Sequence, residues 1–91
     1  MTNYDRNEAE ILRRESERTG KYPSISFSKY DTSLEGFVVI PVKPEADEKT
    51  LAALGYSRVS AKEIRETKGL QRYPKLELFK ISWQNLEEIH S

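Results

Sequence analysis

Cysteine is absent from the sequence, histidine occurs once, and no apolar run is longer than four residues. Without cysteine the chain has no disulfide framework, no thiolate nucleophile and no cysteine metal site. A run of four residues is far too short to span a bilayer. The first eight residues also lack the basic-then-apolar pattern of a signal peptide. We therefore expect a cytoplasmic protein that does not insert into a membrane.

Few residues could carry out catalysis. The single histidine, His90, is next to the last residue of the sequence, where chains usually fray, so we expect it to be solvated rather than a base or a ligand. No His, Cys or carboxylate cluster has the spacing of a zinc site. The four glycines are too far apart to form a phosphate-binding loop. The acidic residues lie beside lysine and arginine, so solvation and pairing explain them. We predict no catalytic residue, no metal and no cofactor.

The composition indicates one folded domain over residues 1–91. Hydrophobic residues make up 36% and charged residues 33% of the chain, and the apolar residues cluster into periodic segments. The 15 basic and 15 acidic residues balance overall, but unevenly along the chain. Residues 1–48 contain seven basic and ten acidic residues, whereas residues 49–80 contain eight basic and three acidic ones. A basic surface is therefore expected in the second segment.

The first half of the chain predicts a helix followed by a hairpin. Charged pairs at i,i+4 spacing and a thin apolar stripe predict a helix over Asp5–Arg18 that covers the core by one edge, which we favour over a binding helix. Alternation over Tyr22–Tyr30 predicts a half-exposed strand. Apolar residues on both faces of Leu34–Val42 predict the central strand, and the turn residues between the two strands predict an antiparallel hairpin.

The second half predicts two helices, a strand and a short final helix. A helix is expected over Asp47–Leu54, ended by Gly55. Ser60 followed by Glu63 is a capping box for a second helix, with Gly69 as its left-handed cap. Residues 76–83 predict a strand inside the sheet, and residues 86–89 a short helix. The fold class is α+β, with the order α-β-β-α-α-β-(α) and helices on one face of a mainly antiparallel sheet of about three strands. The core is expected to include Phe27, Phe37, Val38, Ile40, Leu54, Ile64, Leu78 and Ile81.

One local pattern suggests a binding surface. Residues 51–64, Leu-Ala-Ala-Leu-Gly-Tyr-Ser-Arg-Val-Ser-Ala-Lys-Glu-Ile, resemble two helices joined by a tight glycine turn, as in a helix-turn-helix. That resemblance covers the segment around residues 47–69. It implies that Lys62 and Arg65 of the second helix contact phosphates and base edges, together with the residues at the start of that helix. The Leu54-Gly55-Tyr56 turn is also similar to that of ubiquitin-associated-type three-helix modules, which bind proteins. A helical hairpin that only covers the sheet is the third interpretation. The candidate residues for binding a partner or nucleic acid are Ser57, Arg58, Ser60, Lys62, Arg65, Lys68 and Arg72.

We expect this chain to be a small interaction protein that is not an enzyme. A protein is the favoured partner, bound through charged helical faces or an exposed sheet edge. By analogy of size, such a chain could be a regulator, inhibitor or adaptor, including a phage-type inhibitor of a host system. The alternative is a DNA-binding regulator that uses the helix-turn-helix-like segment, and an unrecognised enzyme is the third hypothesis. A homodimer stays open.

Overall fold

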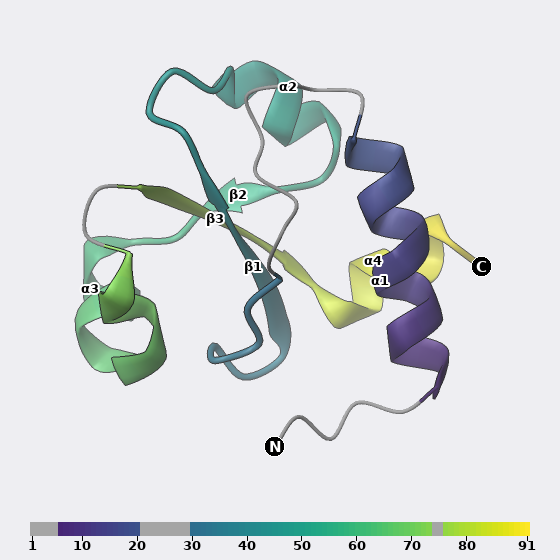
Figure 1. The fold of residues 1–91 in the computed structure, drawn as a ribbon, viewed down its shortest axis with the longest axis horizontal. Helices are drawn as coiled ribbons and strands as arrows, with labels where there is room; N and C mark the ends of the chain where they lie inside the picture. Colours follow the sequence, from purple (N-terminus) through teal and green to yellow (C-terminus); the bar gives the residue numbers. More distant parts are fainter. Residues whose placement is uncertain (1–5, 21–29, 74–75) are drawn as a thin grey trace.

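In the computed structural model, which describes residues 6–20, 30–73 and 76–91, helices surround a three-stranded antiparallel sheet (Figure 1). This confirms the predicted α+β class with a mainly antiparallel sheet. Two of the three described strands correspond to the ones predicted over Leu34–Val42 and residues 76–83, whereas the third, at residues 57–58, was not predicted. In chain order the elements are α1 (Arg6–Thr19), β1 (Phe37–Val42), α2 (Glu48–Ala53), β2 (Ser57–Arg58), α3 (Ala61–Glu66), the 3-10 helix η1 (Lys68–Arg72), β3 (Glu77–Ser82) and α4 (Trp83–Ile89).

The sheet has the strand order β1-β3-β2, and both pairings are antiparallel. Phe37 pairs with Ser82 at one end of the β1–β3 ladder, and Arg58 pairs with Phe79 across β2 and β3. Among the described strands β3 therefore takes the central position that the sequence assigned to Leu34–Val42. Both faces of β3 are covered, which explains why its sequence is apolar on both sides.

Helices lie on both faces of the sheet, which corrects the expectation that they share one face. Alternate residues of β1 point to opposite faces. Val38 and Ile40 belong to a larger core cluster with residues of α1, α2 and α4, whereas Val39 belongs to a smaller cluster with Leu70 of η1, against which Ile64 of α3 packs. Figure 1 accordingly shows α3 at one end of the molecule and α1 with α4 at the other.

The core predictions were partly right. Val38, Ile40, Leu78 and Ile81 are buried, as predicted. Three other predicted core residues are only half-buried, namely Phe37, Leu54 and Ile64. Leu54 and Ile64 pack against the two clusters. The core predicted from the sequence did not include several side chains that are fully buried, among them Leu51, Leu70, Phe79 and Leu86.

Two glycines of the described chain have positive φ, Gly36 at 83° and Gly55 at 99°. Gly55 follows α2, as predicted, because a left-handed residue after a helix is usually glycine. Gly69 was wrongly predicted to be such a cap. It lies inside η1, and a Cβ atom there would be 2.2 Å from the Ser33 hydroxyl oxygen, so glycine is needed for close approach rather than for φ.

The first predicted strand, Tyr22–Tyr30, and the predicted core residue Phe27 lie mostly or wholly outside the described residues. Next to them, Asp31 forms an isolated antiparallel bridge with Val39 of β1. Within residues 6–20, 30–73 and 76–91, no helix has the length and apolar composition needed to cross a membrane. The longest of them is α1, with 14 residues.

Candidate functional site

The seven candidate residues lie along β2, α3 and η1, which follow one another in the chain. Apart from Ser57, which is exposed on β2, the structure separates them into two groups. Some have side chains that are engaged in the fold, and others are exposed and have no charged partner among the described residues. This difference determines which of them are available to a partner.

Arg58 belongs to the engaged group. Its guanidinium forms an ion pair with Glu48 of α2 and lies 3.2 Å from Glu77 of β3, and it stacks 4.8 Å from the centre of the Phe79 ring. These contacts raise the pKa of Arg58, mainly through its hydrogen bonds to the two carboxylates. Arg58 therefore connects α2 to the edge of the sheet. Its neighbour Ser57 is exposed on β2.

Ser60 also has a structural role. Its hydroxyl oxygen accepts a hydrogen bond from the Glu63 backbone N–H at 3.1 Å, and the Glu63 carboxylate accepts one from the Ser60 N–H at 3.0 Å. This is the predicted capping box, and it is confirmed. Glu63 also forms an ion pair with Lys80 of β3, which holds α3 against the sheet.

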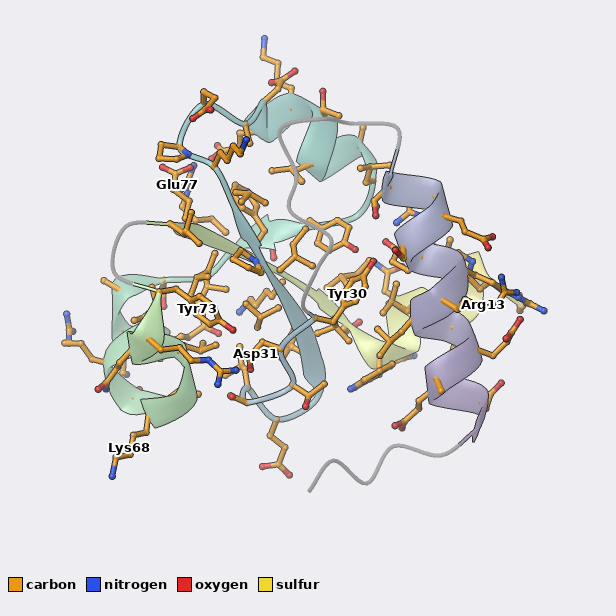
Figure 2. The ribbon with its side chains drawn as sticks, viewed as in Figure 1. Arg13, Tyr30, Asp31, Lys68, Tyr73 and Glu77 are labelled. Atoms are coloured by element: carbon orange, nitrogen blue, oxygen red, sulfur yellow. The ribbon has the colours of Figure 1, made fainter. Side chains whose placement is uncertain are left out.

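Arg72 is held by a buried carboxylate. Its guanidinium is 2.7 Å from Oδ2 of Asp31, a side chain that is 1% exposed, and the Tyr73 hydroxyl donates to the same oxygen at 2.9 Å (Figure 2). Burial alone would raise the pKa of Asp31. The hydrogen bonds from Ser33, Arg72 and Tyr73 have the opposite and larger effect, so the pKa lies below its ordinary value. Asp31 thus fastens η1 to the start of the turn before β1.

Lys62, Arg65 and Lys68 form the second group, and we call them the α3–η1 cations. All three are exposed. Among the described residues, no ion pair includes any of them. In Figure 2 the Lys68 side chain points away from the rest of the molecule. Lys62 and Arg65 are three residues apart on α3, a spacing that places them side by side on a helix surface.

The structure does not support the helix-turn-helix interpretation. Strand β2 separates α2 from α3 and pairs with β3, so the two helices are not joined by a tight turn. Leu54 and Tyr56 belong to the core cluster on one face of the sheet, whereas Ile64 packs on the other face. The pattern was misleading because a strand of two exposed residues has almost no sequence signal.

A buried charge cluster around Glu15 was not predicted. The Glu15 side chain is 0% exposed and accepts hydrogen bonds from Arg18 at 2.8 and 2.5 Å and from the Tyr56 hydroxyl at 2.5 Å. The fourth contact is with Nε2 of His90 at 2.7 Å. Burial raises the pKa of Glu15, but the bonds from Arg18, Tyr56 and His90 lower it more, and the pKa lies below its ordinary value. Burial and the adjacent Glu15 carboxylate raise the pKa of Tyr56, so its hydroxyl stays protonated as a donor.

His90 is therefore not the solvated terminal residue that we expected. Its side chain is 10% exposed, and its carbonyl oxygen accepts a hydrogen bond from Arg14 at 3.0 Å. It also lines a pocket of about 350 Å³ between α1 and the end of α4, together with Glu10 and Glu87. In the part of the chain that is described, no group of three or more His, Cys, Asp or Glu side chains is arranged to hold a metal ion. The cluster's direct role is to join α1, α4 and the segment before β2.

Comparison with known proteins does not assign this chain to a family. No protein-family model, no curated protein and no solved structure matches it.

Proposed function

We propose that this chain is a small, non-enzymatic binding protein whose partner contacts the α3–η1 cations. The observation that carries the proposal is the difference between these three side chains and the other basic residues nearby. Arg58, Arg72 and Lys80 all form ion pairs with carboxylates. The α3–η1 cations remain exposed and without such a partner among the described residues. A complementary acidic surface would gain attraction and faster association from them.

A protein is the partner that we favour. A regulator, inhibitor or adaptor, including a phage-type inhibitor of a host system, would act by occupying its target in this way, and a second copy of the chain is one form such a partner could take. The proposed compartment is the cytoplasm. Surface charges mainly govern association rate and specificity, so the affinity would depend on the apolar contacts that surround them.

Direct DNA binding is the second candidate, because the same cations could contact phosphates. It would now depend on the α3–η1 cations rather than on a helix-turn-helix. An unrecognised enzyme is the third hypothesis, and the pocket beside His90 is where its chemistry would be sought.

The test compares two double charge reversals as baits for affinity capture. Lys62→Glu with Arg65→Glu changes the proposed surface, and Lys43→Glu with Lys49→Glu changes the net charge equally at exposed positions outside α3 and η1. We expect the first bait to lose a partner that both the wild type and the second bait retain. A partner retained equally by both variants would show that this surface is not used.

The DNA alternative is measured directly by fluorescence anisotropy of a labelled mixed-sequence duplex at low and physiological salt. Binding that weakens steeply with salt, and that is lost in the Lys62→Glu, Arg65→Glu variant, would establish phosphate contacts by this surface. An absence of binding at low salt would remove the DNA hypothesis.

A further inference from the structure

An acidic side chain lies among the α3–η1 cations. Glu66 is exposed at the end of α3, one residue after Arg65 and four residues after Lys62. Residues four apart are neighbours on a helix surface. No ion pair found in the described ranges includes Glu66, so its negative charge is available to a partner in the same way as the cations.

From this charge pattern we infer that the partner is a protein segment of mixed charge, which presents carboxylates to the α3–η1 cations and at least one basic group to Glu66. The inference rests on the proposed function, and it specifies the partner's chemistry. A nucleic acid backbone is uniformly negative, so each phosphate close to Glu66 would be repelled. A protein segment can place a lysine or an arginine at that one position.

The length and charge of α3 also disfavour nucleic acid. A recognition helix contacts base edges with its N-terminal residues. The first turn of α3 contains the Glu63 carboxylate, and the helix has six residues, which corresponds to about 9 Å. Glu63 is already bound to Lys80 and to the Ser60 N–H, so it cannot turn away from an approaching phosphate without breaking those bonds.

Beside η1, the described residues offer no aromatic surface on which the bases of a single strand could stack. Tyr73 is the aromatic residue next to η1, and its hydroxyl is bound to Asp31 while the Arg72 guanidinium covers its ring at 5.2 Å. Base stacking requires an exposed ring face beside free cations. At Tyr73 the ring face and the nearest cation are engaged with each other.

The experiment uses the full chain and three labelled probes. The first is a short helical peptide with glutamates along one face, and the second is the same peptide with the central glutamate of that face replaced by lysine. The third is a mixed-sequence DNA duplex. We expect the wild type to bind the lysine-containing peptide about two- to fivefold more tightly than the all-glutamate peptide, the size typical of one exposed charge pair.

Glu66→Lys should reverse the preference between the peptides and strengthen duplex binding. Glu45→Lys makes the same charge change at an exposed position before α2, and it should leave the preference as in the wild type. Equal binding of the two peptides, no binding of either, or a wild type that binds the duplex with steep salt dependence would overturn the inference. Failure of the proposed function is seen separately, as unchanged capture by the Lys62→Glu, Arg65→Glu bait.

Discussion

The buried carboxylate of Glu15 gives the sharpest test of how this fold is held together. Glu15→Gln keeps the shape of the side chain but removes the charge and replaces one acceptor oxygen by a donor. In the wild type the carboxylate accepts hydrogen bonds from Arg18, Tyr56 and His90. The NH2 group of a glutamine at this position would instead face at least one of these donors, and two donors cannot form a hydrogen bond with each other.

The expected cost follows from which of these donors can reach water. Tyr56 is only 4% exposed, so water cannot replace the lost partner of its hydroxyl, and leaving that hydroxyl unpaired costs about 1 to 3 kcal/mol. The Arg18 side chain is 25% exposed and would keep its hydrogen bond to the Leu54 carbonyl oxygen at 2.8 Å, so its charge would still have one protein partner and access to water. Adding the lost charge-assisted bonds, we expect a loss of about 2 to 4 kcal/mol of unfolding free energy.

Urea unfolding followed by the fluorescence of Trp83 and by far-UV circular dichroism measures this loss. A loss of that size lowers the melting temperature by about 10 to 30 °C in a domain of this length. Glu10→Gln is the matched control, because it removes the same charge from the same helix at a side chain whose ion pairs with Arg13 and Arg14 are open to solvent, and it should lower the unfolding midpoint much less. If Glu15→Gln were as stable as Glu10→Gln, the cluster would contribute nothing and the reasoning would be wrong.

The stabilisation that Glu15 provides should depend on pH. The pKa of Glu15 is lower in the folded protein than its ordinary value of 4.5, because the bonds from Arg18, Tyr56 and His90 outweigh the effect of burial. Its stabilisation is therefore complete above about pH 4.5 and is lost as the pH falls through the folded-state pKa. The stability difference between the wild type and Glu15→Gln should shrink below pH 4.5. A difference that stayed constant from neutral to strongly acidic pH would contradict this account.

Three further substitutions test the local structure by the same unfolding assay. Ser60→Ala should cost about 1 kcal/mol by removing the capping box of α3, whereas Ser57→Ala at an exposed strand position should have little effect, and equal effects would contradict the assigned cap. Gly55→Ala should destabilise the fold more than Gly36→Ala. Both glycines have a positive φ, but only at position 55 would a Cβ come close to other atoms, 3.2 Å from the Ile81 side chain, so the reverse order would contradict that packing. Leu70→Ala should cost about 2 to 5 kcal/mol, since η1 is held in the smaller core by this fully buried residue, and a near-neutral effect would mean that η1 does not need it.

Local sequence signals predicted the elements that are defined locally. Ser60 with Glu63 caps α3, and Gly55 ends α2 with a positive φ, both as the sequence indicated. The helix expected from Asp47 is also present, and Asp47 is its N-cap. These features depend on residues within four positions of one another. The extra strand β2 was missed because its two residues are ordered by pairing with β3, about twenty positions away, and not by any pattern of their own.

The exposed members of the candidate surface could be predicted, but their division into two groups could not. Lys62, Arg65 and Lys68 are exposed because they lie on the outer side of short helices. Arg58 and Arg72 look equivalent to them in the sequence, yet they are engaged by carboxylates from other elements. The partner of Arg72 is 41 residues away in the chain, a separation that no local pattern reports.

His90 and Glu15 show how a long-range contact reverses the interpretation of a residue. A histidine next to the end of the sequence is expected to be solvated, and an acid between arginines on a helix is expected to be paired at the surface. Because α4 packs beside α1, the two side chains meet across 75 positions, where Glu15 is fully buried and His90 mostly buried. The charge cluster thus stabilises one end of the molecule, while the exposed charges that distinguish the proposed binding surface lie at the other end, on α3 and η1 (Figure 1).

Since sites that far apart usually contribute independently, Glu15→Gln should change stability without changing the preference between the two peptides, measured at a temperature where the variant is folded. A changed preference would mean that the two ends are coupled.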